Sequence, residues 1–152
     1  MTKILSGALE MLSNMTPSLQ DGEFVFCSVS ADADIRGLGA VGTFRESEGL
    51  TIITERRQAF EAGLDASIAM RQITLNVNSA LEGVGLTAGV SMALAQAGIP
   101  CNMVAAFHHD HVFVPAELAA RAMRVLQSVQ DEALQASATV PRSSAADEPG
   151  VS

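Results

Sequence analysis

The sequence predicts an α+β fold in which helices cover one face of an antiparallel sheet. Several short runs alternate apolar with polar residues, as strands buried on one side do. Other runs repeat apolar residues at helical spacing, with glycine or proline where a helix would begin or end. The chain has 152 residues, 48% of them hydrophobic, which is enough to bury a core and fits one compact domain or two small subdomains that share one core.

The first half combines one helix, three strands and a second, short helix. Residues 4–14 place apolar side chains at helical spacing, and Pro17 breaks this pattern. The β-rich run 23–30 is followed by a polar, glycine-bearing loop, and two further strands turn at the sequence SEG to form a hairpin. Residues 55–63 predict a short helix that Gly63 ends, since glycine adopts a left-handed cap conformation at little cost.

The second half has a sharper pattern. It opens with a half-buried strand, because Ile73, Leu75 and Val77 alternate with polar residues. An amphipathic helix follows and ends at a glycine, two strands come next, and a last helix begins after Pro115. The apolar faces are formed by Leu86, Val90, Ala93, Leu94 and Ala97 in the first helix and by Leu118, Ala122, Val125, Leu126 and Val129 in the second.

The order of this second half, β-α-β-β-α, is the start of a ferredoxin-like βαββαβ unit, and its fourth strand is missing. The first half gives α-β-β-β-α-β, which could be a similar unit without its first strand. Residues 66–78 are either shared between the halves or close one half and open the other. We expect an N-terminal half over residues 1–66 and a C-terminal domain over 67–131. The segment 132–152 is predicted to be a disordered tail, because it is small, polar and proline-containing.

The stretch ITLNVNSALEGVGLTAGVSMALAQAGIPCNMVAAFHHDHVFVP resembles the ACT-domain superfamily, in particular its small stand-alone tandem-ACT proteins of bacteria. The segments LSNMTPSLQDGEFVFCSV and FRESEGLTII resemble the N-terminal half of the same proteins. The resemblance implies two ferredoxin-like ACT units per chain. It also implies a regulatory module that usually binds an amino acid at an interface between two units and has no chemistry of its own.

The loop EGVGLT connects a strand to a helix, where unpaired N–H groups and the positive end of the helix dipole favour a carboxylate. The resemblance places Gly85 and Leu86 at the loop glycine and the following apolar residue of the ACT pattern. Gly83 and Val84 precede them in the same loop. We therefore expect ligand contacts from these four residues. The alternative is a turn that needs glycine for backbone reasons only.

Two further residues are candidates for ligand contact. Asn102 falls near the asparagine that many ACT sequences carry at the start of their second strand, and its amide can donate to a carboxylate and accept from an ammonium. The alternative is an asparagine that is hydrogen-bonded at a strand edge. Asp110 could pair with a ligand ammonium, or it could be a turn residue that bonds its own backbone.

All three histidines of the chain, His108, His109 and His111, surround Asp110. At a turn between two strands, His109 and His111 would share one face of the sheet and His108 would point away. A zinc site usually has four ligands, or three and a water, and the sequence has no second His or Cys cluster to complete one. We therefore expect no metal site and no cofactor, and histidines that hydrogen-bond locally or across a dimer interface. A metal-dependent enzyme using residues 108–111 is the less favoured alternative.

The composition argues against several classes of partner. The formal net charge is −8 and Lys plus Arg number only 9, so we expect neither nucleic acid nor membrane binding. The chain has no apolar run of the roughly 20 residues that span a bilayer and no signal-peptide core, which predicts a cytoplasmic protein. Taken with the resemblance, these features predict a non-enzymatic module that binds an amino acid and dimerises through sheet edges or helix faces. The alternative is an oligomerisation module without a ligand.

Overall fold

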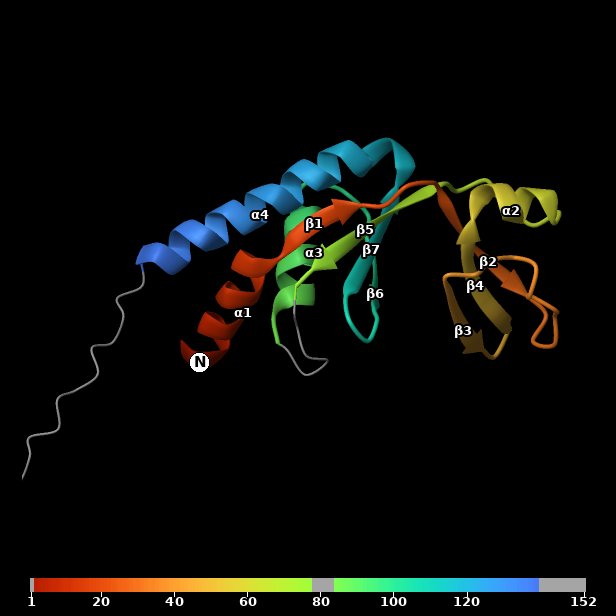
Figure 1. Ribbon diagram of the computed structural model, residues 1–152, viewed down its shortest axis with the longest axis horizontal. Helices are drawn as coiled ribbons and strands as arrows, with labels where there is room; N and C mark the ends of the chain where they lie inside the picture. Colours follow the sequence, from red (N-terminus) through yellow and green to blue (C-terminus); the bar gives the residue numbers. More distant parts are fainter. Residues whose placement is uncertain (1, 78–83, 140–152) are drawn as a thin grey trace, which may run out of the picture.

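One antiparallel sheet of seven strands runs through the computed structural model, which describes residues 2–77 and 84–139. The first and last of the described elements are helices, and two more helices follow strands (Figure 1). In chain order the elements are α1 (Thr2–Asn14), β1 (Thr16–Leu19), β2 (Phe24–Val29), β3 (Gly42–Glu46), β4 (Gly49–Glu55), α2 (Arg56–Glu61), β5 (Met70–Asn76), α3 (Leu86–Gln96), β6 (Asn102–Ala105), β7 (Asp110–Pro115), the 3-10 turn η1 (Ala116–Leu118) and α4 (Ala119–Thr139).

The elements form two lobes, and the predicted α+β architecture is confirmed. The smaller lobe contains β2, β3, β4 and α2, and the larger lobe contains α1, β1, β5, α3, β6, β7 and α4 (Figure 1). The strand order of the main path is β3-β4-β2-β5-β7-β6, and β1 pairs with β5 beside β2. The two lobes therefore share one continuous sheet.

Helices cover one face of the larger-lobe sheet because alternate residues of its strands are apolar. Ile73 and Leu75 of β5 and Val112 and Val114 of β7 are fully buried against the helices. The opposite face carries the intervening residues, among them Gln72, Thr74 and His111. The core between sheet and helices is completed by Met15, Val77, Leu86, Val90, Leu94, Ile99, Ala119, Ala122 and Leu126.

The missing fourth strand of the larger lobe comes from the beginning of the chain. β1 pairs with β5, placing Leu19 opposite Ile73, and α1 packs against α3 and α4. The larger-lobe sheet thus has the order β1-β5-β7-β6. The start of β5 also pairs with the smaller lobe, where Met70 lies opposite Phe24. β5 is therefore shared between the halves, which is one of the two arrangements that the sequence leaves open.

The smaller lobe has its own core on the side of its sheet that α2 covers. Residues 31–40 form turns, where a complete βαββαβ unit has its first helix. The buried side chains of this core are Val25, Cys27, Ile52 and Ala59. A third cluster joins the two lobes and consists of Phe24, Ile53, Met70 and Phe113, with Val104 packed against it.

Three features differ from the sequence-based expectation. β1 was not expected because Pro17 was taken as a break, yet proline is tolerated in an edge strand. α1 and β1 pack in the larger lobe, although they lie within the predicted N-terminal half 1–66. α4 extends to Thr139, so the expected tail is helical over 132–139. The alanine-rich composition there favours helix. The rest of the expected tail lies outside the described residues.

Candidate functional site

Three of the predicted ligand contacts, Val84, Gly85 and Leu86, lie in the loop at the start of α3 within the described residues. They differ in how far solvent can reach them. Val84 is exposed, whereas Leu86 is buried in the larger-lobe core. Gly85 precedes the helix with a left-handed φ of 108°, which a side chain would strain. Gly83 lies outside the described residues. Of this loop, Val84 is therefore the described side chain that a ligand could reach.

Helix α1 packs directly over the start of α3. A Cβ added at Gly85 would lie 2.5 Å from Cβ of Ala8, and one added at Gly89 would lie 3.0 Å from a methyl carbon of Leu12. Both glycines therefore permit close approach of two helices. Helix packing is therefore a sufficient reason for glycine at position 85, and the predicted ligand contact there is not needed to explain it.

Asn102 and Asp110 lie at opposite ends of the hairpin formed by β6 and β7. Asn102 is exposed, pairs with Phe113 and donates from its side-chain nitrogen to the carbonyl oxygen of Phe113 at 3.4 Å. Asp110 pairs with Ala105 and with Leu75 of β5. The predicted contacts are thus divided between a core position, a helix start and two ends of a hairpin.

His111 lies on the helix-free face of the larger lobe and is held by β5. Its Nδ1 is 3.1 Å from Nε2 of Gln72 and 3.0 Å from Oγ1 of Thr74. Because an amide nitrogen can only donate, Nδ1 accepts, and the neutral ring carries its proton on Nε2. Burial lowers the pKa of His111, the nearby His109 lowers it further, and Asp110 opposes both. The site favours the neutral imidazole.

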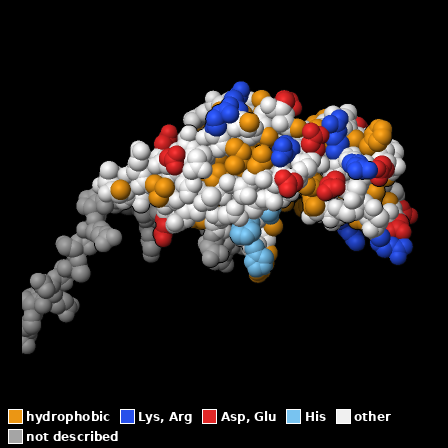
Figure 2. Space-filling model, turned by 45° about the horizontal axis from the view of Figure 1, so that its top comes forward, with side chains coloured by type: hydrophobic (Ala, Val, Ile, Leu, Met, Phe, Trp, Pro, Cys, Tyr) orange, Lys and Arg blue, Asp and Glu red, His pale blue; other side chains and the backbone are white. Residues whose placement is uncertain are grey.

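The other histidines lie at the tip of the hairpin. The rings of Phe107 and His108 meet edge to face with centroids 4.9 Å apart, and Phe107 is 76% exposed. Nδ1 of His109 is buried and has no hydrogen-bond partner among the described residues. Figure 2 shows the histidine side chains together on a projection of the surface. Within 2–77 and 84–139, no three His, Cys, Asp or Glu side chains are placed to hold one metal ion.

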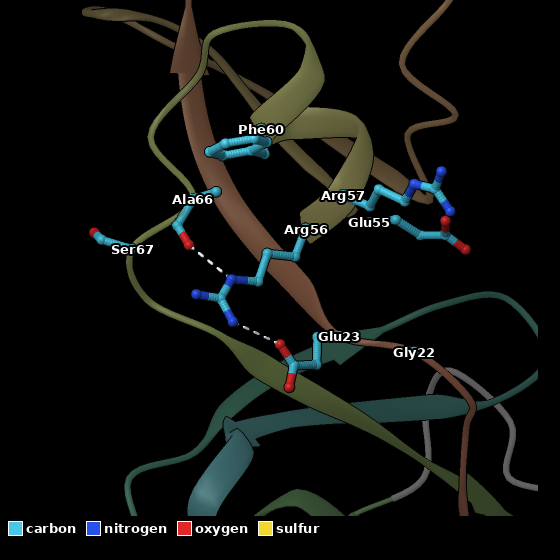
Figure 3. Close-up of a pocket in the computed structure, with 8 residues that line it drawn as sticks. All are labelled: Gly22, Glu23, Glu55, Arg56, Arg57, Phe60, Ala66 and Ser67. Atoms are coloured by element: carbon cyan, nitrogen blue, oxygen red, sulfur yellow. Dashed lines mark hydrogen bonds and ion pairs between the residues drawn. The ribbon is translucent and has the colours of Figure 1, made fainter.

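A cavity of about 670 Å³ opens on the smaller lobe near the junction with the larger one (Figure 3). Three segments surround it: the bend before β2, the end of β4 with the start of α2, and the connection that leads into β5. Its size is that of an ordinary small-molecule pocket. The lining residues are Gly22, Glu23, Glu55, Arg56, Arg57, Phe60, Ala66 and Ser67.

Arg56 is the central polar side chain of this cavity. Its Nη1 is 2.9 Å from Oε2 of Glu23, and its Nε donates to the carbonyl oxygen of Ala66 at 2.9 Å. The main-chain N–H of Arg56 donates to the carbonyl oxygen of Glu23, also at 2.9 Å. The guanidinium is therefore held in place while 46% of its side chain stays exposed.

Sequence reasoning missed this cavity, although a signal was present. Arg56 and Phe60 are separated by four residues in a short helix, so they lie on one face of it. Phe60 is 75% exposed, which an apolar helix face directed at a core would not allow. The partners Glu23 and Ala66 come from distant segments, and no local pattern could bring them to Arg56.

Two family models match the chain in tandem. A model described as ACT domain matches residues 9–71, and a second model, also described as ACT domain, matches residues 67–128. The chain belongs to the ACT-domain family. ACT domains are regulatory modules that bind small molecules, so this tandem pair has a regulatory, ligand-binding role in that general sense. The two matches meet at residues 67–71, where β5 passes from one lobe to the other.

Solved structures share this ACT fold. A Vibrio cholerae protein of unknown function, described as a possible transport protein, is 41% identical, with a TM-score of 0.76, over 84% of this chain and 98% of its own. A protein of Agrobacterium tumefaciens is 16% identical, with a TM-score of 0.64, over 77% and 90%. The regulatory subunit of aspartate kinase from Thermus flavus is 14% identical, with a TM-score of 0.56, over 75% and 96%.

A comparison with curated proteins gives no match. None of the helices within the described ranges is both long enough and apolar enough to cross a membrane.

Proposed function

We propose that this ACT-domain protein is a regulatory module that binds a free amino acid and has no catalytic activity of its own. The observation that carries the proposal is the tandem pair of ACT-domain matches over residues 9–71 and 67–128. The likeness of fold to an aspartate kinase regulatory subunit agrees with it. The proposed setting is the cytoplasm, and the proposed form is a homodimer.

Two places on the chain are candidates for the amino acid. One is the strand-to-helix loop of the larger lobe with Gly83, Val84, Gly85 and Leu86, and with Asn102 and Asp110 beyond it. In this loop Val84 supplies the reachable side chain, and α1 packs on Gly85. The other is the cavity around Arg56.

The direct test is a thermal-shift screen of the purified protein against the twenty L-amino acids, with their D-enantiomers as controls. A ligand at 100 times its dissociation constant stabilises the folded state by about 2.7 kcal/mol. We expect one amino acid, or a few related ones, to raise the melting temperature while the D-forms do not. The absence of a shift with all twenty would contradict amino-acid binding.

A second candidate is an assembly module that works without a ligand. The observation that favours it is the exposed side of α3, where Met92 is 60% exposed and no charged residue occurs in the helix. Val84, two residues before the helix, is 61% exposed. An assembly module predicts a melting temperature that rises with protein concentration and does not respond to amino acids. A melting temperature independent of concentration would exclude it.

A further inference from the structure

The lining of the smaller-lobe cavity contains a guanidinium, a carboxylate and an exposed aromatic ring. Arg56 contacts Glu23 directly, whereas the ring of Phe60 lies on the other side of Ala66 from the guanidinium (Figure 3). We propose that this cavity binds a free α-amino acid with an apolar side chain: the ligand carboxylate contacts Arg56, its ammonium contacts Glu23, and its side chain lies on Phe60. This inference rests on the proposed function, to which it adds a site and a ligand class.

Arg56 has unused hydrogen-bonding capacity in a fixed position. A guanidinium has five N–H donors, and the hydrogen bonds to Glu23 and Ala66 use two of them. The remaining nitrogen, Nη2, has no partner among the described residues and points away from Glu23 (Figure 3). A carboxylate can therefore bind to Arg56 without displacing the bonds that hold the side chain.

Glu23 supplies the complementary charge beside Arg56. Its Oε2 faces the guanidinium, and 43% of its side chain is exposed. In an α-amino acid the carboxylate and the ammonium are attached to the same carbon, so they need receptors of opposite charge next to each other. The pair Arg56–Glu23, with nitrogen and oxygen 2.9 Å apart, meets that requirement.

Phe60 gives the cavity an apolar surface at a suitable distance. It follows Arg56 by four residues in α2, so the two side chains lie one turn apart, about 6 Å along the helix axis. The ring is 75% exposed in the free chain. A ligand side chain that covers it would bury apolar surface on both partners, and this favours leucine, methionine or phenylalanine over glycine.

The charges around the cavity favour a zwitterion over a multiply charged anion. Arg56 and Arg57 are balanced by Glu23 and Glu55, so the lining carries no net formal charge. Arg57 is already paired with Glu61 at 3.1 Å. A phosphate-bearing ligand would meet two carboxylates, whereas a neutral amino acid with separated charges meets one group of each sign.

The test is titration calorimetry of the full chain with L-leucine, L-methionine, L-phenylalanine and glycine. Leucinamide, which lacks the carboxylate, and 4-methylpentanoate, which lacks the ammonium, are the matched analogues of leucine. We expect the apolar amino acids to bind more tightly than glycine and both analogues to bind at least tenfold more weakly than leucine. Arg56→Gln should weaken leucine binding roughly ten- to a hundredfold.

Two variants complete the design. Phe60→Ser should abolish the preference for leucine over glycine, and because Phe60 is exposed this change leaves the core intact. Arg36→Gln is the matched control, since Arg36 forms another exposed ion pair, with Asp34, at 2.7 Å. It should leave leucine binding unchanged.

The outcomes separate this inference from the proposed function. If Arg56→Gln and Phe60→Ser bind leucine as the unmodified protein does, while Val84→Asp does not, the cavity is excluded and amino-acid binding stands at the other site. If the unmodified protein binds none of the four amino acids in the calorimeter but responds to others in the thermal screen, the ligand class is wrong. If no amino acid acts in either measurement, both proposals fail.

Discussion

Gly85 shows how one residue can satisfy two requirements. Its φ of 108° belongs to the left-handed region, where an added Cβ costs roughly 1–2 kcal/mol. The same Cβ would meet Ala8 of α1 at 2.5 Å, a distance that requires a helix to move. The glycine is therefore required by helix packing even in a protein without a ligand.

Gly85→Ala is accordingly predicted to lower the free energy of unfolding by more than Gly63→Ala does. Gly63 also has a positive φ, of 74°, but its Cβ would meet nothing within 4 Å, so it reports the backbone cost alone. Adding Ala8→Gly to Gly85→Ala should remove the contact and restore part of the loss. Urea unfolding measures all four proteins. Equal losses at Gly85 and Gly63 would show that the helix contact is unimportant.

His111 predicts a pH dependence of stability whose sign follows from its lowered pKa. Since the folded-state pKa lies below the unfolded value of about 6.5, the unfolded chain binds more protons in acid. The contribution of neutral His111 is therefore complete above about pH 7 and declines as the pH falls toward the folded-state pKa. The advantage of the unmodified protein over His111→Gln in urea unfolding should be smaller at pH 5.5 than at pH 7.5. Parallel pH curves for the two proteins would contradict this.

Among the elements, α3 is unusual because it contains no charged residue. Leu86, Val90 and Leu94 face the core. The exposed residues of the helix are Thr87, Ala88, Met92, Ala95 and Gln96, so its outer side is uncharged and partly apolar. A large apolar side chain exposed on an uncharged helix face, such as Met92, is a candidate for contact with another molecule. Val84, two residues before the helix, is exposed as well.

Met92→Glu is therefore predicted to weaken dimerisation of the proposed homodimer. The charge would have to be desolvated against the apolar face of a second copy. Gln96→Glu adds the same charge to the same helix at an exposed polar position and serves as control. Sedimentation should show a lower average mass for Met92→Glu than for Gln96→Glu. Equal masses would place the interface elsewhere, for example at a sheet edge.

Helices and strands were predicted correctly where the apolar residues of one segment repeat at a helical or strand period. The alternation of Ile73 and Leu75 and the helical spacing around Leu126 give β5 and α4, since burial imposes these periods on the sequence. β1 was missed because Pro17 suggested a break, and an edge strand tolerates what a central strand would not. The cavity was missed for another reason: Arg56 meets Glu23 across 33 residues, and such a contact leaves no periodic signal.

At the scale of the whole molecule, the lobes are joined by more than a linker. β5 pairs with β7 and β1 in the larger lobe and begins beside β2 in the smaller one. Phe113 of β7 is buried at the junction, with its ring 5.9 Å from that of Phe24 and 5.2 Å from that of Phe26. This arrangement predicts that the lobes unfold together.

Phe113→Ala is predicted to uncouple the lobes. Removing the ring costs roughly 3–5 kcal/mol and leaves a cavity at the junction of the two lobes. Hydrogen exchange in increasing urea should show that amides of β4 and of β7 lose protection together in the unmodified protein and separately in the variant. Phe44→Ala, at a side chain that is 72% exposed, should change the free energy of unfolding by no more than about 0.5 kcal/mol. Separate transitions in the unmodified protein would contradict this view of the junction.

The pairing of β1 with β5, and of α1 with α4, has a consequence for the order of events on the ribosome. Residues 2–19 are synthesised before the smaller lobe, yet α4 begins only at Ala119. At about 5–20 residues per second, the apolar side of α1 waits roughly 5–20 s for α4. The larger lobe can therefore close only after nearly all of the described chain has been made, and until then the apolar side of α1 is exposed to whatever else binds apolar surface.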